Sequence, residues 1–201
     1  MNLGRFGAVG AIIAILVGLA LVAVGINNRL VGLDEAVDAA WSNVENVYQR
    51  RADLIPNLVE TVSGAADFER GTLQDVVDAR SRVGQVNLSG APDATQLQQF
   101  QAAQDQLSGA LSRLLVVVEN YPQLRATEGF LELQSQLEGA ENRIAVERNR
   151  FNEAAQAYNT ARRRLPAALF AGMLGFEEKP YFESAPGSEI APEVDFSDDD
   201  G

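Results

Sequence analysis

Residues 7–26, GAVGAIIAILVGLALVAVGI, form an uninterrupted apolar stretch without a single charged side chain. A helix of this length spans about 30 Å, the thickness of the hydrocarbon core of a bilayer. Because a helix satisfies every backbone N–H and C=O within itself, it is the form in which such a stretch crosses lipid. The sequence therefore predicts a transmembrane helix at residues 7–26, within an N-terminal membrane anchor that covers residues 1–29.

A cleaved secretory signal is the alternative interpretation of this stretch. Ala23, Val24 and Gly25 would serve as a cleavage site of small residues. The apolar run, however, exceeds the usual signal core of about 7–15 residues and continues past that site. These two features favour the anchor.

The residues that follow the stretch are polar. Asn27, Asn28, Arg29 and Gly32 are interpreted as a short polar exit before the first helix of the next domain begins. Arg5 and Arg29 nearly balance each other across the stretch, so the positive-inside rule leaves the orientation in the membrane open.

Composition excludes several kinds of chemistry. The chain of 201 residues has no His and no Cys, which removes the commonest general base, the commonest metal ligand and every thiol. The net charge is −12, and residues 183–201 hold seven acidic residues and no basic one. Nucleic-acid binding needs clustered cations, so we expect no nucleic-acid partner. Residues 183–201 are predicted to be an acidic disordered tail.

Helical periodicity dominates the chain between the anchor and the tail. Apolar residues step by three and four over residues 97–121 and 130–165, and less regularly over residues 33–62 and about 72–84. No stretch shows the two-residue alternation of a strand. Long amphipathic helices with short connections predict an all-α fold, an antiparallel up-and-down four-helix bundle over residues 30–182.

Pro56 interrupts the first of these helices. It cannot donate a hydrogen bond to the carbonyl of Ala52, and it disfavours the helical conformation at Ile55. The apolar pattern resumes at Leu58, which predicts a kinked helix rather than two separate ones. Asn57 or an arginine could satisfy the free carbonyl.

Three stretches of the sequence resemble the bacterial LemA family. They are AWSNVENVYQRRADLIPNLVETVSGAA at residues 40–66, VVVENYPQLRATEGFLELQSQLEGAENRIAVERNRFNEAAQAYN at residues 116–159, and FxxxxGFEEKPYFE at residues 170–183. Glu147 departs from the family pattern, which usually has a small residue there. The resemblance implies a single-pass membrane protein with an up-and-down four-helix bundle and no established biochemical activity. Some relatives occur in magnetosome membranes, which implies a role in membrane shaping or organelle assembly.

The signature stretches contain polar residues that admit two interpretations. A carboxylate pair such as Asp53 and Glu141 could perform acid–base chemistry if one pKa were raised. The same residues could instead cap the kinked helix and pair with arginines between helices. We favour the structural interpretation, because the sequence lacks His, Cys, a phosphate-binding loop and an activated serine. We therefore predict no catalytic, cofactor-binding or metal site, and a structural role for Trp41, Arg51, Asp53, Pro56, Asn57, Glu141, Asn142, Arg148 and Asn152.

Residues 162–176, RRRLPAALFAGMLGF, combine three arginines with an apolar run that is too short to span a bilayer. Such a segment can lie in the head-group layer, where each arginine contributes about 1 kcal/mol toward anionic lipid. It can equally be a flap that closes the end of the bundle. The sequence leaves both open for the membrane-interface candidates Arg162, Arg163, Arg164, Phe170 and Phe176.

Two classes of function remain. The first is a membrane-anchored scaffold or interaction protein of the bacterial envelope, whose partners are the lipid bilayer and either another protein or a second copy. The second is an accessory or sensor subunit of an envelope complex such as a membrane protease. We expect no enzymatic activity and no cofactor. The expected location is the bacterial cell membrane, and the basic triplet favours a cytoplasmic bundle.

Overall fold

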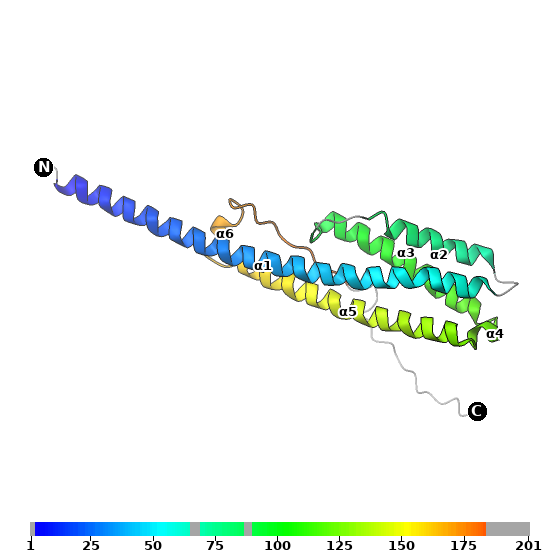
Figure 1. Ribbon diagram of the computed structural model, residues 1–201. Helices are drawn as coiled ribbons and strands as arrows, with labels where there is room; N and C mark the ends of the chain where they lie inside the picture. Colours follow the sequence, from blue (N-terminus) through cyan, green and yellow to red (C-terminus); the bar gives the residue numbers. More distant parts are fainter. Residues whose placement is uncertain (1–2, 65–68, 87–89, 184–201) are drawn as a thin grey trace, which may run out of the picture.

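The computed structural model describes residues 3–64, 69–86 and 90–183, which are almost entirely helical (Figure 1). Six helices follow one another in these residues, and none of these residues forms a strand: α1 (Leu3–Ser63), α2 (Arg70–Val83), α3 (Ala94–Val118), α4 (Pro122–Arg125), α5 (Glu128–Arg163) and α6 (Ala167–Phe170). The predicted all-α class is therefore confirmed. The predicted acidic tail lies outside the described residues, apart from Glu183.

α1 is one uninterrupted helix of 61 residues that contains both Asn27 and Pro56. The predicted polar exit between the anchor and the first bundle helix is therefore wrong. Each Asn costs a helix only about 0.7 kcal/mol relative to Ala. Leu30 and Val37 are fully buried on the body side of the same helix, and burying one such side chain contributes about 1.5–3 kcal/mol. Packing of this face outweighs the weak local preference.

The N-terminal part of α1 projects beyond every other helix (Figure 1). Its large apolar side chains between Ile12 and Val24 are exposed, and the most apolar window has a mean hydropathy of 2.5. A buried core helix would hide these side chains from water. By length and composition, this helix is able to cross a membrane.

α1 and α5 form a long antiparallel pair. Leu30 packs near Ala161 at the end next to the apolar stretch, and Arg51 contacts Glu141 farther along both helices. The shorter helices α2 and α3 form a second antiparallel pair that covers only the far part of α1 and α5 (Figure 1). The helices are thus unequal in length, from 14 residues in α2 to 36 in α5 and 61 in α1.

Two large apolar clusters and a third small one lie in the body, which we define as the described part of residues 30–183. The distal cluster lies far from the apolar stretch and is mainly aliphatic, with buried Ile55, Leu58, Val62, Val76, Leu107, Leu114 and Phe130 among its members. The aromatic cluster lies nearer the stretch and contains Trp41, Tyr48, Phe100, Phe151, Tyr158 and Phe182. Because both clusters draw on α1, α3 and α5, these helices tie the two ends of the body together.

The described part of the chain closes with an extended segment, the C-terminal strap (residues 176–183), which runs back along α5. A tight turn precedes the strap: Phe176 N–H donates to the Ala171 carbonyl at 3.0 Å, and Gly175 has φ +80°. A positive φ at this point is strained for residues other than glycine, so Gly175 permits the reversal. The strap packs Phe182 into the aromatic cluster, which α3 also reaches through Leu97 and Phe100.

Candidate functional site

A buried arginine links three helices between the two apolar clusters. The Arg51 side chain on α1 is almost fully buried, and its residue is 1% exposed. Its Nη1 donates to Glu141 Oε1 on α5 at 2.6 Å and to Ser108 Oγ on α3 at 3.0 Å. Its Nη2 donates to Gln104 on α3, and the guanidinium lies 5.1 Å from the centre of the Tyr48 ring. We call Arg51, Ser108, Gln104 and Glu141 the polar layer.

A second arginine satisfies the carbonyl that Pro56 leaves free. Arg80 Nε on α2 donates to the Ala52 carbonyl at 3.0 Å. Of the two alternatives raised by the sequence, the arginine fills this position, while Asn57 is exposed and its own carbonyl accepts from Thr61 Oγ1. The bond joins the C-terminal turn of α2 to α1, so the proline creates an attachment point between helices.

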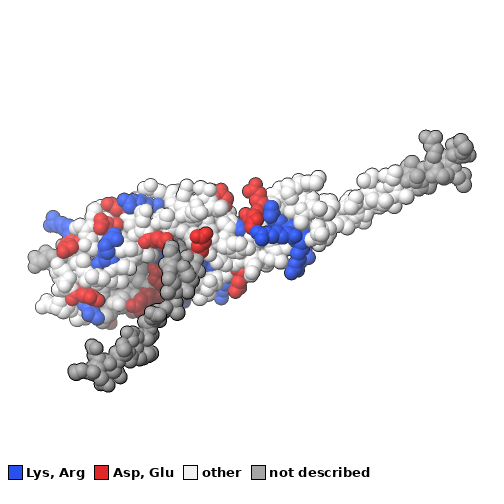
Figure 2. All heavy atoms as spheres, turned by 180° about the vertical axis from the view of Figure 1, so that it is seen from behind, with Lys and Arg blue, Asp and Glu red and all other residues white. Residues whose placement is uncertain are grey.

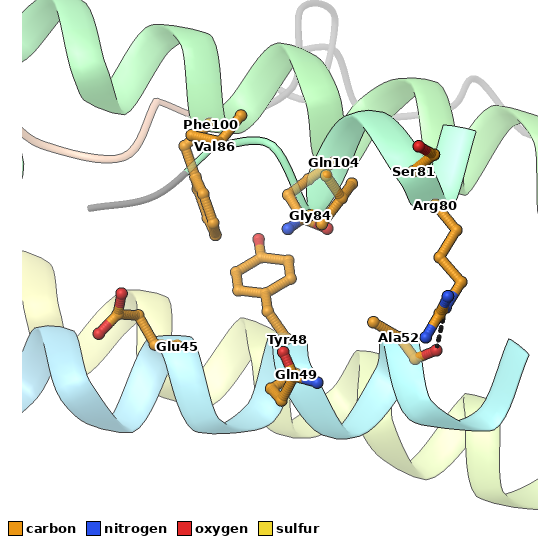
Figure 3. A pocket seen from close by; sticks show the side chains of 11 residues that line it. Glu45, Tyr48, Gln49, Ala52, Arg80, Ser81, Gly84, Val86, Phe100 and Gln104 are labelled. Atoms are coloured by element: carbon orange, nitrogen blue, oxygen red, sulfur yellow. Dashed lines mark hydrogen bonds between the residues drawn. The ribbon is translucent and has the colours of Figure 1, made fainter. Parts of the chain in front are cut away.

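A cavity of about 340 Å³ lies between α1, the end of α2, and α3 (Figure 3). The Tyr48 phenol points into it from α1, facing Gln104 and Phe100 on α3. Burial raises the pKa of the Tyr48 phenol, an effect that nearby Arg148 and Arg51 partly oppose. Burial also raises the pKa of Glu45, and the nearby Trp41 side chain opposes this effect to a smaller degree. The lining thus combines neutral hydrogen-bonding groups with one carboxyl and one guanidinium.

Two asparagines of α5 hold the C-terminal strap by its backbone. Asn152 Nδ2 donates to the Phe182 carbonyl at 3.0 Å, and Phe182 N–H donates back to Asn152 Oδ1 at 2.8 Å. Asn159 makes the same pair of bonds to Lys179, at 2.8 and 3.0 Å. A side-chain amide offers one donor and one acceptor side by side, which matches the N–H and C=O of an extended peptide. Arg148 Nη2 adds a bond to the Glu183 carbonyl at 2.8 Å.

The strap also completes the aromatic cluster. The Phe182 ring stacks on Trp41 with ring centres 6.1 Å apart, and it meets Phe151 edge-on at 5.4 Å. Lys179 Nζ contacts Asp34 Oδ1 at 2.6 Å and lies over the Tyr158 ring. Burial, with a smaller contribution from the Asp34 charge, raises the pKa of Tyr158 to about 12. The strap is therefore an integral part of the core.

The candidates for a membrane interface divide between two surroundings. Arg162 Nε donates to the Phe176 carbonyl at 2.9 Å, and Arg163 forms an ion pair with Glu178. Phe176 is half-buried and packs against the Tyr158 ring, so this aromatic side chain is held by the body. Figure 2 shows basic residues gathered where the projecting helix leaves the body. The remaining two, Arg164 and Phe170, are exposed and half-buried respectively.

The comparison with protein families decides the identity. A model of the LemA family matches residues 40–196. The chain belongs to the LemA family. The match begins after the apolar stretch and covers the whole of the predicted signature, which confirms the resemblance seen in the sequence.

Curated relatives of this LemA-family chain include magnetosome proteins. Magnetosome protein MamQ 1 of Paramagnetospirillum magneticum is 29% identical over 189 aligned residues, which cover 83% of this chain and 69% of the relative. Magnetosome protein MamQ of Magnetospirillum gryphiswaldense is 28% identical over the same shares. Protein LemA of Metamycoplasma hominis is 24% identical over 137 residues, which cover 68% of this chain and 59% of the relative.

The structure places the LemA signature residues in three settings. Trp41, Arg51 and Glu141 join α1 to α3 and α5, while Arg148 and Asn152 hold the strap. The others are exposed on helix surfaces: Asp53, Pro56, Asn57 and Asn142.

The signature does not bring Asp53 and Glu141 to a common partner. Asp53 Oδ1 accepts from Gln49 at 2.7 Å on the surface of α1, whereas Glu141 is held by Arg51. Within the described residues, no group of three or more carboxylates is arranged to hold a metal ion. The geometry of these residues is that of contacts between segments.

Sequence reasoning missed Asn159 as a strap-binding residue. Its spacing of seven from Asn152 was an available signal, because residues seven apart lie on one face of a helix. Lys179 was also missed, since its partner Asp34 lies 145 positions earlier in the chain and no local pattern connects them.

Proposed function

We propose that this LemA-family chain is a single-pass membrane scaffold of the bacterial envelope, which carries out no chemistry of its own. In this proposal the body is an up-and-down four-helix bundle that presents its helix surfaces to a second copy or to another protein. The observation that carries the proposal is the continuity of α1, in which the apolar stretch and the first helix of the body are one element of 61 residues. A body joined to its anchor by a helix, and not by a loop, is held at a defined distance from the membrane.

The contacts of the polar residues support a structural role for them. Arg51, Asn152 and Asn159 each bind groups on other segments of the chain, which occupies the side-chain atoms that a catalytic site would turn toward a substrate. Relatives named as magnetosome proteins support a location at a membrane.

We infer the orientation of the proposed span from the basic residues beside it. Arg29 and the arginines at the end of α5 lie on the body side of the apolar stretch, whereas Arg5 precedes it. Cytoplasmic flanks of a membrane helix carry the excess of Lys and Arg, so the proposed body is cytoplasmic. An impermeant thiol reagent tests this on Val116→Cys, because the chain contains no other cysteine and Val116 is exposed. Labelling in intact cells without permeabilisation would contradict a cytoplasmic body.

The scaffold role is tested by the composition of the complex extracted from membranes. Native mass spectrometry of the tagged full chain in mild detergent is expected to show more than one copy of this chain. One copy bound to one other protein in a fixed ratio would favour the alternative, an accessory or sensor subunit of an envelope complex such as a membrane protease. A chain that is monomeric and without any protein partner would contradict both.

Cysteine cross-linking then locates the contact surface. Val116→Cys on α3 and Val146→Cys on α5 place single thiols on exposed apolar positions of two different helices. Self-association through one face is expected to give disulfide-linked dimers in membranes from one variant and not from the other. Gly10→Cys in the projecting helix serves as the control for collisions within the bilayer.

A further inference from the structure

The turn after α5 lies beside the end of the apolar stretch. Ala171 is buried against Leu30 of α1 and Ala161 of α5, and Ile26 packs against the same small cluster. Ile26 is the last residue of the apolar stretch. Because α1 is unbroken there, any membrane that surrounds the stretch must have its surface at the level of this turn.

The same turn exposes four large apolar side chains, of which Leu174 is the least exposed. Leu165, Leu169 and Met173 are 75, 66 and 85% exposed, among the highest values for large apolar residues of the described body. Neighbouring Ala171 and Phe176 turn toward the protein, so the turn has one face in the core and one outside it. We call residues 165–175 the foot.

Basic side chains flank the apolar side of the foot. Arg163 and Arg164 are both exposed and directly precede it. Arg163 shares Glu178 with Arg162, whereas Arg164 makes no ion pair within the described part of the chain. Figure 2 shows basic residues gathered at this end of the body, next to the projecting helix. Exposed apolar side chains beside arginines match the boundary between acyl chains and anionic head groups.

We propose that the foot inserts Leu165, Leu169 and Met173 into the head-group layer of the membrane that α1 spans, while Arg163 and Arg164 contact anionic lipid. This inference rests on the proposed membrane span of α1. The bilayer is the occupant because the foot lies against the last apolar turn of α1, where lipid is the adjoining phase. The lipid-facing residues are thus the exposed leucines and methionine, and the half-buried Phe176 holds the foot to the body.

A second membrane contact changes what the anchor does. A single helix leaves the body free to tilt and to rotate about the helix axis. A foot that touches the membrane on one side of α1 restricts both motions, so the same face of the body is always turned away from the membrane. The foot therefore sets which surfaces of the proposed scaffold reach a partner.

Lipid-attached quenchers test the contact on the full chain. The protein is reconstituted into phosphatidylcholine–phosphatidylglycerol vesicles that contain lipids with a nitroxide near the head group. Met173→Cys carries an environment-sensitive fluorophore, and Val116→Cys, an exposed apolar position at the far end of α3, is the matched control. The label at residue 173 is expected to shift to the blue and lose most of its emission, while the label at residue 116 keeps its aqueous spectrum. Equal, unquenched emission from both labels would overturn the proposal.

A third label separates failure of the foot from failure of the span. Val17→Cys lies in the middle of the apolar stretch and is expected to be quenched by nitroxides deep in the acyl chains. Quenching at residue 17 without quenching at residue 173 would retain the membrane span and overturn the foot. Absence of quenching at residue 17 would overturn the span itself, and the foot with it.

Lowering the number of protein molecules per vesicle shows whether the bilayer or a second copy of the chain contacts the foot. At about one protein per vesicle, lipid quenching at residue 173 is expected to be unchanged, because the bilayer is present at any protein density. Loss of the blue shift on dilution, with dimers cross-linked through residue 173 at high density, would show that another copy covers the foot and would overturn the proposal.

The arginine contribution is tested by paired charge removal. Arg163→Gln with Arg164→Gln is expected to reduce quenching at residue 173 in anionic vesicles and to make it insensitive to added salt. The matched control changes Arg125 and Arg143, two exposed arginines outside the foot, to Gln, and is expected to leave quenching unchanged. The same response from both double variants would assign the effect to net charge and overturn the assigned head-group contact.

Discussion

The body has a distal half, built around the distal cluster, and a proximal half, built around the aromatic cluster. The two halves cover α1 and α5 in different ways. In the distal half, α2 and α3 pack apolar side chains onto α1 and α5. In the proximal half, only the first turns of α3 reach the aromatic cluster, and the extended strap covers α5 beside them, held by Asn152 and Asn159. A helix satisfies its own backbone, so it needs only an apolar face, whereas an extended segment must find partners for its N–H and C=O groups. The difference explains why contacts in the proximal half require polar side chains at particular positions, such as Asn152 and Asn159. Contacts in the distal half require only well-packed apolar side chains.

The polar layer lies at the boundary between these halves. Arg51 separates Tyr48 of the aromatic cluster from Ile55 of the distal cluster along α1. Buried polar groups of this kind stabilise little by themselves, but they penalise any register in which they lose their partners. We infer that the polar layer fixes the register of α1, α3 and α5. With the register fixed there, each half can use a different kind of packing.

The largest expected effect is the loss of either cluster. Leu111→Asp in the distal cluster and Ile144→Asp in the aromatic cluster each place a carboxylate among buried apolar side chains, which costs more than about 4 kcal/mol. Thermal melting followed by circular dichroism is expected to show an unfolded body for both. The control, Asp53→Asn on the surface of α1, should cost less than about 1 kcal/mol. A folded Ile144→Asp variant would show that the proximal half is not part of one cooperative body.

Removal of the polar layer comes next in size. Arg51→Ala leaves Gln104 buried without its main partner, while Glu141 remains half-exposed to water, and together these cost about 2–3 kcal/mol. The neighbouring exposed Arg50→Ala should change the free energy of unfolding by no more than about 0.5 kcal/mol. Chemical denaturation measures both. If the two variants changed the free energy of unfolding equally, the polar layer would have no stabilising role.

Detachment of the strap is expected to be smaller and local. Asn152→Ala removes a donor and an acceptor that hold Phe182, which costs about 1–2 kcal/mol. Hydrogen exchange should accelerate at the amides of Lys179 and Phe182, and not in the distal half. Asn142→Ala, exposed on the same helix, is the control. Faster exchange throughout the body would mean that the strap is not a separate unit of stability.

The smallest effect at neutral pH comes from Tyr158, which is buried under the strap. Its folded pKa is raised to about 12, above the ordinary value of 10.0, so the folded state holds the phenolic proton more tightly than the unfolded state. The stability it contributes is complete below pH 10 and is lost as the pH rises from about 10 to 12. Denaturation at a series of alkaline pH values should show this slope, reduced in Tyr158→Phe. An unchanged slope in Tyr158→Phe would assign the loss to other groups.

Sequence periodicity could predict the long helices, but it could not predict the extended strap that packs on the proximal half. Phe130 and Ile144 belong to an apolar seam that a single sequence reveals, and α5 forms where the seam predicts it. The strap has no period, because each of its contacts depends on a partner far away in the chain, as between Lys179 and Asp34. The continuity of α1 through Asn27 escaped prediction for a related reason. Local preference there is weak, and burial of Leu30 by segments distant in sequence decides the outcome.

The central claim is that the proposed membrane span and the body share one unbroken helix. Double electron–electron resonance tests it most directly, because it measures the distance between two spin labels. The labels are placed at Ala20→Cys and Ser42→Cys in protein reconstituted into lipid nanodiscs. Both positions lie on the exposed surface of α1. An unbroken helix places these backbone positions about 33 Å apart, so the account predicts one narrow distance distribution near that value. A broad distribution centred at shorter distances would show a break near Asn27, and would contradict both the fixed body and the foot.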